Sequence, residues 1–357
     1  MKKRLLVIAV LLMAAFVCIT VLNGMDTELS PSEPSGSGTA ATDTADIKPS
    51  SKGSPYKFYF ERLTPVEKRV YNAIIEKIYD MPERIAVPKI DGKELDNVFS
   101  ALLFDNPDLF FLGRKCAVET RMWLTYFSVD YIVDKADIAD MRERLDRECE
   151  AFEQTLTDPG NQWRTELEIH DHVIDRCEYH DPEGDLIYSS SYGALVDGRA
   201  ACEGYSKAVK LLLDRAGIEN ALISGVSENG EGSGGAHMWN IVNIGGDYYH
   251  LDCTWDDPVS DDGGKLRMYT YFNLSDEMIS GTHRDFSYDF VCNSTAENYY
   301  IKTGTYFESY SRSSESRLTD IITKSVKNGR YQIQLRFADK KSYDGAVADL
   351  IKGERIY

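Results

Sequence analysis

The stretch HMWNIVNIGGDYYHLDCTW, at positions 237–255, constrains the fold of this 357-residue chain more than any other. Two runs rich in β-branched and aromatic residues flank Gly245-Gly246, a pattern that predicts an antiparallel hairpin with a two-residue turn. A turn with an even number of residues puts His237 and Asp252 on the same face of the sheet, directly opposite or diagonal to each other. An odd number would put them on opposite faces. The expected register therefore brings an imidazole and a carboxylate within hydrogen-bonding reach.

A single cysteine lies where another predicted element begins. The segment GRAACEGYSKAVKLLLDRAGI, at 198–218, predicts a helix over 202–216 that starts at Cys202, and NALISGVS predicts a strand after it. Unpaired amides and the helix dipole favour an anion at a helix N-terminus, and the same amides can donate to a developing oxyanion. Acyl transfer by a thiol needs a base that takes its proton and a group that orients the base. We therefore predict Cys202 as the nucleophile, His237 as the base and Asp252 as the orienting residue.

Each of these three residues also has a structural interpretation. Cys202 lies on the apolar face of its predicted helix, which by itself is typical of a buried core cysteine. His237 taken alone is typical of a structural or surface histidine, and Asp252 taken alone is typical of a turn before Asp257-Pro258. The order of the three residues along the chain and their shared context favour the catalytic interpretation.

Metal binding is a second chemical interpretation of this region. His237, His250, Asp252 and Cys253 offer ligand atoms, but their spacing matches no known site, and Cys253 points to the opposite face of its strand. His250 is also an alternative to His237 as the base. Apart from Cys18 the cysteines are scattered without a CxxC pair, which argues against a zinc knuckle and leaves room for one or two disulfides. We expect no metal and no other cofactor.

The N-terminus predicts export. Three positive charges precede an uncharged apolar run, so residues 1–25 are expected to be a signal peptide or a membrane anchor. Residues 26–55 are rich in Ser, Thr, Pro and Gly and are expected to form a disordered linker. The folded part is then secreted or held at the outer face of the cell membrane. A net charge of −18 disfavours nucleic-acid partners, and the sequence does not indicate an oligomeric state.

Two further regions lie on either side of the segment that contains Cys202, His237 and Asp252. Residues 56–155 predict a mostly helical region, and residues 301–357 predict a small α/β extension. In the first region, helices are expected within 63–80, 91–106 and 135–156, and a strand within 121–133. In the second, a helix is expected near 315–327, a strand at 331–337 and a helix near 342–351.

The segments around the three candidate residues resemble the transglutaminase-like superfamily, in particular its exported bacterial members. YGALVDGRAACEGYSKAVKLLLDRAGI and HMWNIVNIGGDYYHLDCTWDDP carry the resemblance. It implies a papain-like α+β core over 156–300, in which the helix that carries the nucleophile packs on an antiparallel sheet. It also implies the roles given above to Cys202, His237 and Asp252. Tyr192 and Trp239 are then candidates for binding substrate, by lining the acyl site or supporting the oxyanion.

The chemistry implied by this resemblance is cleavage of a peptide or isopeptide amide through a thioester on Cys202. The substrate would be a protein or a peptide, such as a cell-wall or surface protein. Two alternatives stay open. The acyl group could pass to a lysine-like amine, which cross-links proteins, or the chain could be a cell-surface binding module that keeps the fold with little catalysis.

Overall fold

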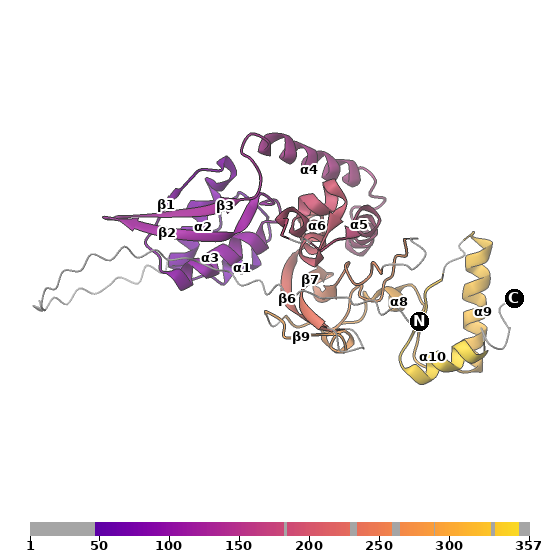
Figure 1. Ribbon diagram of the computed structural model, residues 1–357. Helices are drawn as coiled ribbons and strands as arrows, with labels where there is room; N and C mark the ends of the chain where they lie inside the picture. Colours follow the sequence, from indigo (N-terminus) through magenta and orange to yellow (C-terminus); the bar gives the residue numbers. More distant parts are fainter. Residues whose placement is uncertain are drawn as a thin grey trace, which may run out of the picture.

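The computed structural model describes residues 47–181, 184–228, 234–258, 265–288, 290–329 and 333–349 (Figure 1). The predicted signal peptide or anchor at 1–25 and the predicted linker up to residue 46 lie outside these ranges. Within them, none of the helices is long and apolar enough to cross a membrane.

Residues 47–55, the end of the predicted linker, belong to the folded part. Asn72 Nδ2 donates to the Lys48 carbonyl at 2.9 Å, and the Ser50 amide donates to Asn72 Oδ1 at 2.9 Å. Ser54 is buried, and its amide donates to Asn106 Oδ1 at 3.2 Å. The predicted linker therefore extends too far, because polar side chains of two helices satisfy the backbone groups of this segment.

Residues 56–155 combine helices with a small sheet. The helices are α1 (Phe58–Glu61), α2 (Pro65–Ile75), the 3₁₀ turn Ile78–Asp80, α3 (Gly92–Asp105) and α4 (Ile138–Glu153). The antiparallel sheet has the order β1-β3-β2 and consists of β1 (Ile85–Val87), β3 (Leu124–Tyr131) and β2 (Leu112–Arg121). The predicted strand at 121–133 corresponds to β3, whereas β1 and β2 were not predicted. "Mostly helical" is therefore an incomplete description of this region.

The helix that begins at Cys202 packs on a four-stranded antiparallel sheet, as expected. This helix, α6 (Cys202–Arg215), lies against β6 (Asn220–Glu228) and β7 (Gly234–Ile244), and α5 (Gln162–Arg176) packs beside α6 (Figure 1). The sheet order is β8-β7-β6-β9, with β8 at Asp247–Leu251 and β9 at His283–Arg284. The α+β fold class is confirmed.

Short elements connect these parts and extend the chain beyond them. Between α5 and α6 lie β4 (Glu178–Tyr179), the 3₁₀ turn Leu186–Ser189, the π-helical turn Gly193–Asp197 and β5 (Arg199–Ala200). After the sheet come α7 (Asp276–Ile279), α8 (Tyr299–Lys302), β10 (Tyr306–Phe307), α9 (Arg312–Lys327), β11 (Arg336–Phe337) and α10 (Lys340–Val347). The last four form a small α/β unit with its own apolar cluster, which Figure 1 shows apart from the main sheet.

The β7–β8 hairpin has one of the two registers that place His237 and Asp252 on the same face. Ile244 pairs with Asp247 and Asn240 with Leu251, so the turn consists of Gly245 and Gly246. Both glycines have positive φ, +67° and +98°, which favours glycine in such a turn. Continued by one residue, this register sets Asp252 opposite residue 239, diagonal to His237 and on the same face.

The N-terminal region and the main sheet share one apolar core. The Tyr59 hydroxyl donates to the Leu222 carbonyl of β6 at 2.6 Å, and Lys210 of α6 donates to the Tyr56 carbonyl at 3.2 Å. Arg114 of β2 forms an ion pair with Glu203, the residue after Cys202. The first turn of α6 is therefore held from the N-terminal side as well as by the sheet.

Candidate active site

Cys202 is the first residue of α6 and is partly exposed. A Cβ at Gly204 would lie 2.6 Å from the Cβ of Ala200 and 2.7 Å from the Tyr188 carbonyl oxygen, so a glycine lets this turn approach the preceding chain closely. Among the cysteines that the structure describes, Cys202 is the one that is not buried. The interpretation of Cys202 as a buried core cysteine is therefore wrong, because the residue lies at the end of the apolar face of α6.

His237 lies between Cys202 and Asp252. Its Nε2 is 2.7 Å from Asp252 Oδ2, which leaves Nδ1 for the hydrogen bond between the ring and the Cys202 thiol. Burial disfavours the imidazolium, but the charge and hydrogen bond of Asp252, together with those of Cys202, outweigh burial and raise the pKa of His237 to about 10. The arrangement therefore favours a proton on His237 beside the thiol.

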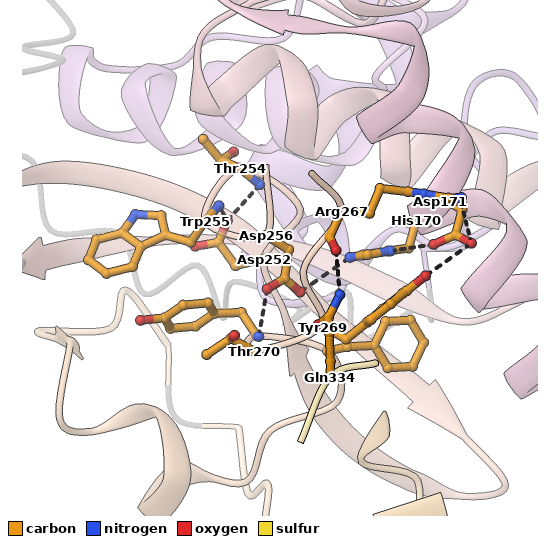
Figure 2. Close-up of polar contacts among 12 residues, drawn as sticks. His170, Asp171, Asp252, Thr254, Trp255, Asp256, Arg267, Tyr269, Thr270 and Gln334 are labelled. Carbon is orange, nitrogen blue, oxygen red and sulfur yellow. Dashed lines mark hydrogen bonds and ion pairs between the residues drawn. The ribbon is translucent and has the colours of Figure 1, made fainter. Parts of the chain in front are cut away.

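Four hydrogen-bond donors surround the buried carboxylate of Asp252. Oδ2 accepts from Nε2 of His237 and, at 3.0 Å, from Nε2 of His283. Oδ1 accepts from the backbone amides of Thr254 at 3.0 Å and Trp255 at 3.2 Å (Figure 2). Burial favours the neutral acid, but the charges and hydrogen bonds of the two histidines outweigh it and hold the pKa of Asp252 well below its usual range. The carboxylate is therefore ionised and fixed in one orientation.

Another buried histidine holds the turn that follows Asp252. His170 of α5 has Nε2 at 3.2 Å from Asp256 Oδ2 and Nδ1 at 3.1 Å from Asp171 Oδ1, and Arg267 pairs with Asp171 at 2.6 Å (Figure 2). Burial lowers the pKa of His170, but the hydrogen bonds and charges of both aspartates outweigh burial and raise it to about 9. The position of Asp252 thus depends on α5 as well as on the sheet.

Two residues that contact the histidine–aspartate pair were not predicted. His283 reaches Asp252 because β9 pairs with β6, with His283 opposite Ser227. The ring centroid of Trp255 lies 6.1 Å from that of His237 and 4.9 Å from that of His283. Trp255 lies three residues after Asp252 in the sequence DCTW, so its closeness to the site could be inferred from the sequence, whereas the sequence around His283 contains no motif that signals its position.

Tyr192 and Trp239, the predicted substrate-binding residues, do not line the site. Tyr192 is buried and stacks on Phe110 with 5.0 Å between ring centroids. Trp239 is fully buried, stacks on His237 at 5.8 Å and donates through Nε1 to His250 Nδ1 at 3.0 Å. Buried rings present no surface to a substrate, so the prediction is corrected. Trp239 instead supports the base from within the core.

The residues of the metal interpretation are not gathered at one point. His250 Nε2 lies 2.9 Å from Asp276 Oδ1, while its Nδ1 accepts from Trp239. Both ring nitrogens are thereby engaged, and His250 is not available as the base. Cys253 is buried, and burial raises the pKa of its thiol well above the usual range.

A different trio has the proximity that a metal ion needs. One ligand atom from each of His237, Asp252 and His283 lies within 4.8 Å of the others. Both nitrogen-to-Oδ2 distances are those of hydrogen bonds, so protons on the two Nε2 atoms account for the arrangement. An ion would have to displace both protons, and one of these hydrogen bonds orients the base.

Comparison with known proteins agrees with this geometry. Residues 150–253, which include Cys202, His237 and Asp252, match the family model of the transglutaminase-like superfamily. Residues 150–253 are thus similar to a transglutaminase-like domain. His283 lies outside the matched segment of this domain. None of the curated proteins compared with the chain matches it.

Three solved structures have similarity to parts of the chain. A structure described as a TGase shares 14% identity over 48% of this chain and 50% of its own, with a TM-score of 0.27. A candidate cysteine protease from Cytophaga hutchinsonii shares 14% over 41% of this chain and 56% of its own, with a TM-score of 0.25. A candidate protease from Parabacteroides distasonis shares 15% over 43% of this chain and 40% of its own, with a TM-score of 0.25. The chain thus spans about half the length of these proteins.

Proposed function

We propose that this protein is a cysteine-dependent acyl-transfer enzyme that hydrolyses a peptide or isopeptide bond through a thioester on Cys202. The observation that carries the proposal is the position of the His237 imidazole, between the Cys202 thiol and the ionised carboxylate of Asp252. A thiol at a helix N-terminus, a base and a buried orienting group are the three parts that this chemistry requires.

Acylation follows from this geometry. Nδ1 of His237 takes the thiol proton, and the Cys202 thiolate attacks the carbonyl carbon of the amide. Backbone amides in the first turn of α6 have no acceptor within the helix and can stabilise the developing oxyanion. The C–N bond then breaks as His237 returns the proton to the leaving amine, which leaves an acyl group joined to Cys202 by a C–S bond.

Deacylation reverses the roles. His237 Nδ1 takes a proton from water, and the resulting hydroxide attacks the thioester carbonyl. The C–S bond breaks, a carboxylic acid leaves, and the proton returns to the sulfur. Throughout, Asp252 holds Nε2 of His237 and stabilises the imidazolium, so the same nitrogen always faces the reacting atoms.

We further propose that the reaction takes place outside the cytoplasm, on a protein or peptide. The charged-then-apolar N-terminal sequence supports this location, and the net charge of −18 makes a nucleic-acid substrate unfavourable.

Trapping of the acyl-enzyme tests the proposed reaction. The protein is incubated with fluorogenic peptidyl amides and with peptides acylated on a lysine side chain, and is then acid-quenched for intact and peptide mass spectrometry. We expect an acyl adduct on Cys202, absent in Cys202→Ala and retained in the control Cys149→Ala, which changes a buried cysteine of α4. Turnover that survives Cys202→Ala would contradict the proposal. Repetition with a primary amine present distinguishes hydrolysis from cross-linking, because an amide product would identify the amine as acceptor.

A further inference from the structure

His283 shares one carboxylate oxygen with the proposed catalytic base. Its Nε2 lies 3.0 Å from Asp252 Oδ2, the same atom that lies 2.7 Å from Nε2 of His237. We propose that His283 is a positioning residue, which fixes the carboxylate of Asp252 so that His237 presents Nδ1 to Cys202. This inference rests on the proposed function and adds a fourth residue to the site, from outside the matched segment 150–253.

The His283 imidazole comes from a part of the chain that is separate in sequence from the other site residues. His283 lies on the two-residue strand β9, which pairs with the edge of β6 opposite Ser227. Its side chain is fully buried, and its Nδ1 is 2.9 Å from Thr282 Oγ1. Because both ring nitrogens have partners, the ring cannot rotate without the loss of two hydrogen bonds.

The protons on the two rings follow from the charge on Asp252. An ionised carboxylate can only accept hydrogen bonds, so both Nε2 atoms that contact Oδ2 must carry a hydrogen. For His237, a hydrogen on Nε2 leaves Nδ1 as the atom that exchanges a proton with the Cys202 thiol. The orientation of the carboxylate therefore decides which nitrogen of His237 faces the nucleophile.

His283 completes this orientation. The amides of Thr254 and Trp255 hold only Oδ1, which by itself leaves Oδ2 with the single bond to His237. With the hydrogen bond from His283, Oδ2 accepts from two donors, as Oδ1 does. Rotation of the carboxylate then costs hydrogen bonds at both oxygens, in a place where water cannot replace them.

Substitutions of His283 separate positioning from packing. His283→Gln keeps an N–H donor at the end of the side chain, whereas His283→Leu removes the donor. His250→Gln is the matched control, because His250 is a buried histidine of the same sheet that bonds Trp239 and Asp276 and does not contact Asp252. Urea unfolding of each variant identifies any loss of folded protein.

The first readout is the rate at which iodoacetamide alkylates Cys202 in the folded protein at about pH 6, where an ordinary thiol is protonated. We expect His283→Leu to slow alkylation roughly tenfold, and both His283→Gln and the control to stay within about threefold of the wild type. Equal rates in wild type and His283→Leu would overturn the inference. The inference would also be overturned if His283→Gln and His283→Leu slowed the alkylation of Cys202 equally while both variants were as stable as the wild type.

The second readout does not depend on the reactivity of Cys202. In protein labelled with ¹⁵N-histidine, hydrogens on Nε2 of His237 and His283 are expected as two sharp downfield N–H signals, since both are buried and bonded to a carboxylate. The His237 signal should broaden in His283→Leu and stay sharp in His283→Gln; an unchanged signal in His283→Leu would contradict positioning. If wild-type Cys202 reacts slowly while these signals behave as expected, the proposed function fails and the positioning of the imidazole stands.

Discussion

At the scale of single residues, one buried carboxylate sets the properties of the site. Asp252 stays ionised because four donors outweigh the cost of its burial. Against the effect of burial, its charge and hydrogen bond, together with those of Cys202, raise the pKa of His237 to about 10. Charges interact more strongly away from water, so this pair influences Cys202 more than an exposed pair would.

Asp252→Asn tests this dependence. The substitution keeps the shape of the side chain and removes its charge, so His237 loses the interaction that favours its protonated form. We expect the alkylation rate of Cys202 at about pH 7 to fall at least tenfold, by analogy with the neutralisation of the orienting carboxylate in other triads.

Asp257, five residues after Asp252, offers a matched control. Asp257 accepts a hydrogen bond from the Tyr205 hydroxyl at 2.7 Å, which an asparagine oxygen can also accept. Asp257→Asn should therefore leave the alkylation rate of Cys202 near that of the wild type. A similar loss in both variants would point to general destabilisation and contradict a specific role for the charge of Asp252.

At the scale of elements, local signals account for what the sequence predicts correctly. α2 and α3 begin with capping boxes, at Thr64 and Asp91, and each carries an apolar periodicity, so their positions follow from neighbouring residues. The position of the β7–β8 hairpin likewise follows from a local signal, the glycine pair Gly245-Gly246 at its turn. By contrast, β2 (Leu112–Arg121) has several charged residues, and β9 has two residues in all. Their pairing partners, rather than their own composition, make them strands.

The hairpin turn gives a prediction at this scale. Gly245 has φ of +67°, and a Cβ there would contact nothing within 4 Å, so a substitution tests backbone strain without a steric clash. We expect Gly245→Val to lower the free energy of unfolding by about 1–2 kcal/mol. Gly245→Asn should cost less, because asparagine adopts positive φ more readily. Urea denaturation measures both; equal stability of the valine variant and the wild type would contradict the assigned turn.

At the scale of the whole molecule, the site draws on segments that are far apart in the sequence. α6 supplies Cys202, the hairpin supplies His237 and Asp252, β9 supplies His283, and α5 holds the turn after Asp252 through His170. The apolar core that joins the N-terminal region to the sheet also includes residues of α5 and α6. We infer that the N-terminal region and the transglutaminase-like domain unfold together.

This distribution explains how much of the site the sequence could reveal. The juxtaposition of His237 and Asp252 follows from hairpin register alone and was predicted. His283 approaches Asp252 through a pairing between strands distant in sequence, which no local pattern encodes. Tyr192 and Trp239 were assigned to substrate because they lie near the motifs, but their burial depends on neighbours such as Phe110 and His250.

Two buried titratable residues of α5, His170 and Glu166, predict how the stability of the protein depends on pH. The pKa of His170 is raised in the folded state from 6.5 to about 9, so its stabilising contribution is complete below about pH 6.5 and is lost as pH rises towards 9. Glu166, buried one turn earlier, has a pKa raised by burial to about 8, which also makes the folded state less stable as pH rises towards that value. We expect the free energy of unfolding to fall between pH 6.5 and 9, and His170→Gln to reduce that fall. A stability that rises over this interval would contradict the assigned protonation of this cluster.

The central claim is that His237 is the base that makes the Cys202 thiol reactive. The most direct test is the rate of iodoacetamide alkylation at each described cysteine as a function of pH, measured by peptide mass spectrometry in the wild type and in His237→Ala. We predict that Cys202 reacts rapidly at about pH 6, that it slows markedly in His237→Ala, and that the buried cysteines stay slow in both proteins. The claim is contradicted if Cys202 reacts no faster than the buried cysteines, or if its rate at this pH is the same without His237.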